Sequence, residues 1–416
     1  MSDRFTLSRR TFLQSSGSAA AFAAPLILST RVFGANDIIG IGHIGVGRRA
    51  MGLVSDFSHT KGSQIVAISD VDRPRMDHVA KDKTWKKYPD FRQMLEDKDV
   101  DAVVIATPDH WHALHSIYAC MAGKDVYVEK PMTLTIAEGR AMVTAARKYK
   151  CIVQCGSQQR SMEKCRIGCE LVRNGKVGAI KVAHAANYHS PWDQPFPTQP
   201  VPEGLDWNAW LGPTPERGYH IDLYTPRANP GWISITPYSG GEVTGWGAHG
   251  LDMIQWALGM DHTGPVEIWP EGSFRDLNRI VNMKYANGTV IRTDGKGPDG
   301  GAVFDGEKGS ILVDRGVYKV MPDELGQDPM SDPEQKLQVS HNHQQNWLDC
   351  IRSRELPIAD VEIGHRASIL CHMVNIARWT NRKMQWDPEK EIFVGDDNAN
   401  TYLDRPRREP WGLPQL

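Results

Sequence analysis

The chain has 416 residues, of which 40% are hydrophobic and 24% are charged, and its formal net charge is -2. This hydrophobic content is enough for a sizeable buried core. The nearly balanced charge gives no electrostatic reason to expect nucleic acid or an acidic membrane surface as a partner. Without an N-terminal signal about 380 residues remain, which typical domain sizes divide into two domains.

The first residues have the pattern of an export signal. Arg9 and Arg10 precede a run of apolar and small residues from Ala19 to Leu28, which is too short to span a bilayer. Paired arginines ahead of such a run indicate the twin-arginine (Tat) export route. The segment resembles the signals of proteins that are exported already folded. We predict a signal peptide at residues 1–34, a periplasmic or otherwise exported protein, and no membrane association once the signal is removed.

Residues 35–156 alternate short apolar runs with amphipathic stretches. The runs IIGIGHIG, SQIVAIS, DAVVIAT, KDVYVE and CIVQCG carry few charges and predict buried strands. Between them, HWHALHSIYACMAG and TIAEGRAMVTAARKY have helical spacing, and Thr135 and Glu138 form a capping box at the start of the second. This alternation predicts an α/β fold, with a doubly wound parallel sheet in an N-terminal Rossmann domain.

Residues 157–416 have a different pattern of predicted secondary structure. Residues 158–175 predict one helix, and the following strands, with a hairpin turn at Asn287 and Gly288, predict antiparallel pairing. A Pro-rich segment at residues 190–204 predicts a surface loop. This part is therefore expected to form a second domain built on an antiparallel sheet.

The first strand ends in a GxGxxA fingerprint formed by Gly45, Gly47 and Ala50. Gly45 permits a tight turn, Gly47 lets the backbone approach a pyrophosphate closely, and Ala50 allows the helix to pack closely on the strand. The following helix N-terminus, with Arg48 or Arg49, would bind the phosphates. Asp70 ends the next strand, where a carboxylate binds ribose hydroxyls and repels a 2′-phosphate, so NAD is favoured over NADP.

A second motif, Glu129-Lys130-Pro131, directly follows a predicted strand. A lysine at the carboxyl edge of a parallel sheet lies where ligands bind in open α/β folds. Its ammonium can hydrogen-bond a substrate hydroxyl and favour the alkoxide as hydride leaves. Lys130 is therefore a candidate catalytic residue.

The cysteines, a group of histidines and the many tryptophans could each be structural or functional. The seven cysteines are odd in number and include no CxxC, and we interpret them as small apolar fillers. His110, His112 and His115, with Asp109, could be read as metal ligands, but a strand-to-helix bend would splay them, so we predict no metal site. The thirteen tryptophans favour a carbohydrate ligand, because aromatic planes stack on sugar rings.

Together these motifs resemble the Gfo/Idh/MocA family of sugar and cyclitol oxidoreductases. The resemblance rests on the glycine turn, Asp70, ATPDHWH (106–112), VEKP (128–131) and SGGEVTGWGAHGLD (239–252). It implies a C-terminal α+β domain with a large, open, mostly antiparallel sheet at residues 157–416, substrate bound between the domains, and a homo-oligomer. It also implies cofactor contacts from Thr107, Pro108, His112, Glu129 and Lys130, with His249 as the catalytic acid/base.

One position departs from the family pattern. Family dehydrogenases usually carry an aspartate four residues before the histidine, where this chain has Gly245. Either His249 and Lys130 suffice, or another group such as Asp252, Tyr188 or His189 replaces the missing carboxylate. Asp252 could instead be a structural carboxylate. The candidate substrate contacts are Arg160, Tyr188, Tyr238 and Asp252.

The export signal and the dinucleotide fold together favour a tightly held cofactor, because the periplasm offers no dependable supply of free NAD. We predict an NAD-dependent oxidoreductase acting on a hydroxyl of a small carbohydrate: a sugar, glycoside or cyclitol. A redox-neutral, NAD-dependent glycoside hydrolase is an alternative. A non-catalytic sugar-binding protein on the same fold is another.

Overall fold

The computed structural model describes residues 37–416, apart from residues 274–275, 277 and 327–333. The predicted signal peptide at residues 1–34 lies outside the described residues. Within the described part of the chain, no helix is both long enough and apolar enough to cross a membrane.

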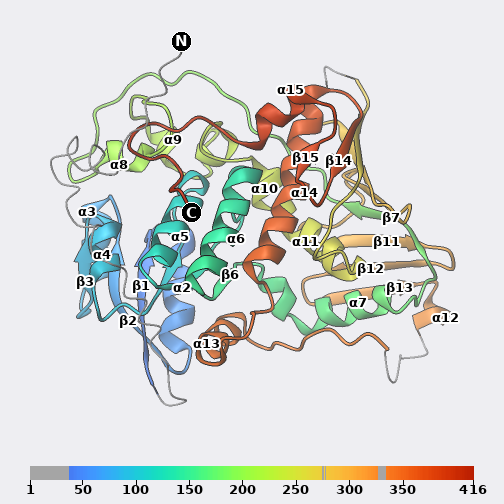
Figure 1. Cartoon of the computed structure of the whole chain (residues 1–416), viewed down its shortest axis with the longest axis horizontal. Helices are drawn as coiled ribbons and strands as arrows, with labels where there is room; N and C mark the ends of the chain where they lie inside the picture. The colour runs from blue at the N-terminus through green and yellow to red at the C-terminus, as the bar shows by residue number, and fades with distance from the viewer. Residues whose placement is uncertain (1–36, 274–275, 277, 327–333) are drawn as a thin grey trace, which may run out of the picture. The chain divides into compact units, whose positions relative to one another are not determined.

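The first half of the described chain forms a six-stranded parallel sheet in the order β3-β2-β1-β4-β5-β6 (Figure 1). All residues of β1, β4 and β5 are buried, as their apolar sequences predict. The strand order reverses between β1 and β4, where a doubly wound sheet opens a crevice. The strands are β1 (Ile39–Ile44), β2 (Ser63–Ser69), β3 (Lys86–Tyr88), β4 (Ala102–Ile105), β5 (Asp125–Val128) and β6 (Val153–Cys155); the helices between them are α2 (Arg48–His59), α3 (Arg73–Val79), α4 (Phe91–Glu96), α5 (Asp109–Met121) and α6 (Ile136–Tyr149).

A nine-stranded sheet, in the order β13-β12-β11-β7-β10-β9-β8-β14-β15, forms the second half. Its pairs are antiparallel except for β7 and β10, which run parallel. The predicted hairpin turn is present, with Gly288 at φ +92°. The predicted Rossmann sheet and mostly antiparallel sheet are thus confirmed. The strands are β7 (Ile180–Ala185), β8 (Glu267–Glu271), β9 (Ile280–Lys284), β10 (Val290–Arg292), β11 (Ala302–Gly306), β12 (Ser310–Asp314), β13 (Val317–Met321), β14 (Met384–Asp387) and β15 (Ile392–Phe393).

The single helix predicted over residues 158–175 is wrong. Two helices form, η1 (Gln158–Ser161) and α7 (Glu163–Arg173), separated by Met162 in extended conformation. Because of this break, the side chain of Gln159 bonds the carbonyl of Gly300 and that of Arg160 bonds Asp252, both in the interior. The other helices are α8 (Trp207–Leu211), α9 (Ile221–Tyr224), η2 (Trp232–Ser234), α10 (Glu242–Gly245), α11 (Gly247–Leu258), α12 (Asp323–Gly326), α13 (His343–Ser353), α14 (Val361–Thr380), α15 (Asp397–Asn400) and η3 (Thr401–Leu403).

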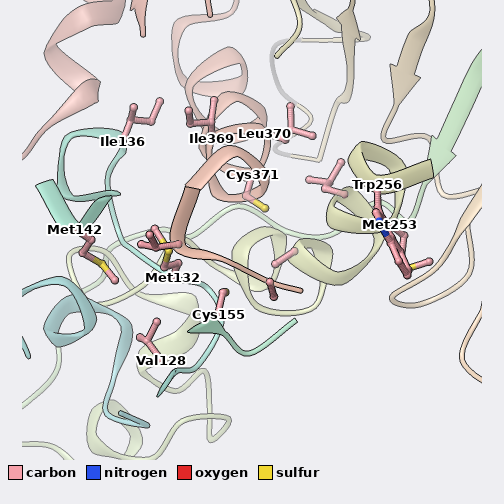
Figure 2. Close-up of a cluster of buried hydrophobic side chains, with 14 of the residues drawn as sticks. Val128, Met132, Ile136, Met142, Cys155, Met253, Trp256, Ile369, Leu370 and Cys371 are labelled. Carbon is pink, nitrogen blue, oxygen red and sulfur yellow. The ribbon is translucent and has the colours of Figure 1, made fainter. Parts of the chain in front are cut away.

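One buried cluster continues from the parallel sheet into helices α11 and α14. Figure 2 shows some of its members, with Met132 from the first half beside α14 and Met253 on α11. A Cβ at Gly364 would lie 2.7 Å from the Cβ of Cys155, so glycine permits the close approach of α14 to β6. All seven cysteines are buried and unpaired, which agrees with their interpretation as apolar fillers.

Helix α13 comes late in the sequence but completes the core of the Rossmann half. The side chain of Trp347 is fully buried there, and its ring packs edge-on against Phe57 and Tyr127 at centroid distances of 5.6 and 5.8 Å. Its indole N–H donates to the carbonyl of Ile152 at 3.3 Å. The parallel sheet therefore depends on a helix that the sequence division at residue 156 assigns to the second domain.

Replacing this indole tests that dependence. We expect Trp347→Ala to lower the free energy of unfolding by about 3–5 kcal/mol, because it removes a large buried side chain and leaves a cavity. Trp192→Ala is the control, since Trp192 is 40% exposed. Chemical denaturation monitored by circular dichroism measures both changes, and equal losses would contradict the packing argument.

Candidate active site

A cleft of about 1090 Å³ lies at the carboxyl ends of the parallel strands. It is lined by the glycine turn after β1, by the residues that follow β4 and β5, and by residues around α10 and α11. Residues 186–238, which we call the insertion, supply another part of the lining. The cleft therefore brings together segments that are far apart in the sequence.

The glycine turn has the geometry of a phosphate-binding turn. Gly45 has φ +83°, and a Cβ there would lie 2.8 Å from Cγ2 of Thr107, so a larger residue would collide. Gly47 begins α2 without a side-chain cap, and a Cβ there would meet only Arg75 at 3.9 Å. The uncapped helix N-terminus and the open space before it fit a diphosphate.

The other predicted cofactor residues of this turn are placed consistently. Ala50 on α2 is fully buried, and Arg48 lines the cleft. Asp70 accepts hydrogen bonds from the backbone N–H groups of Val46 at 2.8 Å and Asp72 at 2.9 Å. Its carboxylate therefore braces the glycine turn, and each oxygen can still accept a bond from a ribose hydroxyl. Burial raises the pKa of Asp70, against the backbone bonds that lower it.

Residues after β4 are tied to the turn after β5. One ring nitrogen of His112 lies 2.9 Å from the carbonyl oxygen of Thr107, and the other lies 2.7 Å from that of Pro131. His112 thus braces two loops of the cleft, and Thr107 and Pro108 line it. His110 bonds the carbonyl of Trp210 at 2.8 Å. Among the described residues, no three His, Cys, Asp or Glu side chains are grouped so that they could hold a metal ion.

Glu129 anchors the floor of the cleft. Its Oε1 accepts from Nε of Arg49 at 2.8 Å and from the side-chain amide of Gln158 at 2.9 Å. This carboxylate is almost fully buried, and Arg49 neutralises it. Arg49 is therefore already paired, which leaves Arg48 as the cation at the first turn of α2 for phosphate oxygens.

Lys130 and His249 line the same end of the cleft. The ammonium of Lys130 donates to the carbonyl of Gly245 at 3.0 Å, and lies 5.8 Å from the ring centroid of Trp246. That indole ring is in turn 5.9 Å from the ring of His249. The two predicted catalytic residues thus flank one tryptophan.

Burial disfavours the charged form of both groups. Burial lowers the pKa of Lys130, and the carboxylates of Glu129 and Asp109 oppose this. Burial also lowers the pKa of His249 well below its usual value, and the charges of Lys130 and Arg315 lower it further. His249 is therefore neutral at physiological pH and can accept a proton. Neither of its ring nitrogens has a hydrogen-bond partner among the residues that the structure describes.

None of the four predicted substrate contacts is among the residues that line the cleft. Arg160 and Asp252 form a buried ion pair with N–O distances of 2.8 to 3.0 Å, because each needs a partner of opposite charge out of water. Tyr238 is fully buried in an aromatic cluster. The hydroxyl of Tyr188 donates to Asp299 at 3.0 Å.

Several cleft residues were missed by sequence reasoning. Trp246 lies inside a motif already noted, but its stacking partner Arg315 comes from the β12–β13 turn. The guanidinium carbon of Arg315 lies 5.0 Å from the Trp246 ring centroid, and its Nε donates to Gln159 at 3.1 Å. Arg227 belongs to the insertion. No local pattern marks residues that only the fold brings together.

The insertion packs onto the loop after β2, beside Asp70. The backbone N–H of Arg73 donates to the carbonyl of Gly204 at 3.0 Å, and that of Asp206 donates to Val71 at 2.9 Å. The Tyr224 hydroxyl donates to the carboxylate of Asp72 at 2.7 Å. The predicted loop at residues 190–204 is mostly exposed, but the residues after it form a buried aromatic cluster and line the cleft.

A glycine turn at the switch point of a parallel sheet, with a lysine and a neutral histidine across the cleft, defines a dinucleotide-dependent oxidoreductase fold. Residues 38–157 match the NAD-binding Rossmann-fold model of the GFO_IDH_MocA oxidoreductase family, and residues 176–413 match its C-terminal alpha/beta domain model. The chain belongs to the Gfo/Idh/MocA oxidoreductase family.

Two curated relatives are glycosidases by name. A glycosyl hydrolase family 109 protein from Shewanella baltica is 29% identical over 212 residues, which cover 44% of this chain and 46% of the relative. An alpha-N-acetylgalactosaminidase from Shewanella oneidensis is 32% identical over 165 residues, which cover 37% of this chain and 36% of that protein. Each match thus spans less than half of the relative.

Solved structures share the fold. The WlbA dehydrogenase from Bordetella pertussis, in complex with NADH and UDP-GlcNAcA, has a TM-score of 0.63 at 18% identity and covers 84% of this chain and 98% of its own. A myo-inositol dehydrogenase from Lactobacillus casei, in complex with NAD(H) and myo-inositol, has a TM-score of 0.56 at 19% identity, with coverages of 84% and 97%. At these identities the likeness establishes the fold alone.

The carboxyl group of Asp109 gives a testable pH dependence. Burial raises its pKa to about 6, so the folded protein binds this proton more tightly than the unfolded chain does. Ionisation therefore costs stability, and the cost grows as the pH rises from about 4 to about 6. We expect the free energy of unfolding of Asp109→Asn, relative to wild type, to increase over this window by up to about 3 kcal/mol. Urea unfolding across the window measures it, and a constant difference would contradict the assignment.

Proposed function

We propose that the protein is an NAD-dependent oxidoreductase that acts on a hydroxyl of a sugar, glycoside or cyclitol and keeps its cofactor bound. The observation that carries this proposal is that Lys130 and the neutral His249 line the same cleft as the glycine turn. A dinucleotide held at that turn would extend along the cleft toward these two groups. Family membership supports the class of reaction.

Several residues would hold the cofactor. The N-terminus of α2 and Arg48 would bind the diphosphate, Asp70 the ribose, and Thr107 and Pro108 would line the nicotinamide half. NAD rather than NADP is our proposal, because Asp70 would repel a 2′-phosphate. When bound, NAD supplies the acceptor for a hydride from the substrate carbon.

The chain's own groups would handle the proton and the oxygen. The neutral imidazole of His249 would accept the hydroxyl proton as the substrate C–H bond breaks and a carbonyl forms. The ammonium of Lys130 has N–H groups beyond the one bonded to Gly245, and one could donate to the substrate oxygen as negative charge develops there. A retained cofactor would return the hydride to a carbonyl compound, so the overall reaction is redox-balanced.

A second candidate is a redox-neutral glycoside hydrolase. The names of the two Shewanella relatives favour it. In this scheme a ring hydroxyl is oxidised, the transient ketone acidifies the neighbouring C–H, and loss of that proton expels the aglycone. Water then adds to the resulting double bond, and reduction of the ketone returns the hydride. His249 and Lys130 would serve in both schemes, since each begins with the same oxidation.

Export by the Tat route and assembly into a homo-oligomer are also part of the proposal. Export rests on Arg9 and Arg10, outside the described residues. Retention of the cofactor would make such export useful. Cofactor retention is supported by the contacts of the insertion with the loop after Asp70, because they hold the insertion against the side of the cleft assigned to the adenosine.

Cofactor retention is the direct test of the proposed function. We expect the purified protein to carry nicotinamide dinucleotide and to convert a carbohydrate without added NAD. Retention through a purification requires a Kd in the nanomolar range, roughly -12 kcal/mol. Denaturation followed by assay of the released NAD(H) measures the content, and D-glucose, myo-inositol and 4-nitrophenyl N-acetyl-α-D-galactosaminide serve as first probes. Release of nitrophenol would favour the hydrolase, whereas cofactor-free protein that needs stoichiometric NAD would contradict retention.

Lys130→Ala separates chemistry from cofactor binding. We expect turnover to fall by about 10²-fold or more, because the variant loses the donor to the reacting oxygen. The NAD content should not change, since the glycine turn and Asp70 hold the cofactor. Steady-state rates and released NAD(H), measured on the same preparation, give the two quantities. Near-normal turnover would remove Lys130 from the mechanism.

A further inference from the structure

Glu242 begins α10, one turn before Gly245. Its carboxylate folds along the helix, so that Oε2 lies 2.8 Å from the point where a Cβ of residue 245 would stand. Gly245 is helical and has no positive φ, so the backbone itself does not require glycine there. Glycine at position 245 instead leaves the space that the carboxylate of Glu242 occupies.

This carboxylate is fixed between a cleft residue and the segment that contacts Lys130. Arg227 donates to Oε1 of Glu242 from Nε at 2.7 Å and to Oε2 from Nη2 at 3.2 Å, and Arg227 lines the cleft. On the other side, Lys130 donates to the carbonyl of Gly245. Glu242 therefore lies against the residue that accepts the bond of the predicted catalytic ammonium.

Other charged groups near Lys130 have separate roles. Glu129 is held by Arg49 and Gln158. Asp109 accepts a short bond of 2.6 Å from the hydroxyl of Ser239. Glu242 differs from both because it precedes His249 on adjoining helices and fills the side-chain position of residue 245. The charged and titratable groups that interact electrostatically with Lys130 are Glu129, Asp109, Arg227, Glu242 and His249.

We propose that Glu242 is a positioning residue of the active site, supplying from one helical turn earlier the negative charge that residue 245 cannot supply. It holds Arg227 at the cleft and stabilises the ammonium of Lys130. The catalytic consequence rests on the proposed function. The electrostatic consequence, a change in the titration of Lys130, can be measured without any substrate.

The first experiment measures that titration. Full-length protein labelled with ¹³C at the lysine Cε is titrated by NMR, and the Lys130 resonance is assigned by its loss in Lys130→Arg. Removing the negative charge in Glu242→Gln disfavours the ammonium, so the pKa of Lys130 should fall. The double variant Glu242→Ala/Gly245→Asp should restore it, because the new carboxylate enters the vacated space. Glu389→Gln, an exposed and distant change of the same type, should leave it unchanged.

The second experiment measures hydride transfer in the same variants, from the absorbance of the bound nicotinamide, with the three carbohydrate probes named above. Glu242→Gln should slow the step at least about tenfold at neutral pH and shift its pH profile, and the double variant should recover most of the rate. The NAD content should be equal throughout, which excludes a general loss of fold.

An unchanged Lys130 titration in Glu242→Gln would overturn the inference, and so would a double variant that fails to restore it. These outcomes are independent of the proposed function. Wild-type protein that transfers no hydride with any probe would count against that function, while the NMR titration would still decide the role of Glu242.

Discussion

The buried ion pair between Arg160 and Asp252 determines where His249 stands in the cleft. Arg160 lies in η1, directly after the last strand of the parallel sheet, and Asp252 lies three residues after His249 on α11. Arg160 also bonds Asp261, beyond the end of α11. Both members of the pair are at most 2% exposed, so loss of Arg160 would leave the carboxylate of Asp252 buried without its partner, at a cost of about 3–5 kcal/mol. The pair therefore fixes α11 relative to the Rossmann sheet.

The hydrogen bond from Lys130 to Gly245 completes this arrangement. Lys130 follows β5 of the parallel sheet, whereas Gly245 ends α10, just before the helix that carries His249. Lys130 and His249, the two proposed catalytic residues, are thus positioned from both halves through one buried ion pair and one hydrogen bond. Because the core in Figure 2 is continuous between the halves, relative motion of lysine and histidine would disturb many apolar contacts.

The sequence predicted the fold and the ends of the cleft because both depend on local patterns. Apolar strands, the glycine turn and the lysine after β5 each have a signal within a few residues. Arg160 was predicted as a substrate contact, and Asp252 as either a substrate contact or a structural carboxylate, but their pairing across 92 positions is visible only in the fold. Arg227 and Arg315 lie in loops without periodicity. The roles that sequence analysis missed depend on contacts between residues far apart in the sequence, and local propensities carry no signal for such contacts.

The insertion relates the two ends of the site to the proposed cofactor retention. Its residues 204–206 bond the loop after β2, while Arg227 reaches the side of the cleft near Glu242 and Gly245. One segment of the chain therefore contacts the end assigned to the adenosine and the end assigned to the reaction. A cofactor retained as proposed would be held at the side that this segment lines, whereas a small carbohydrate would enter near Trp246, which is 37% exposed. In this arrangement slow cofactor release and rapid substrate exchange are compatible.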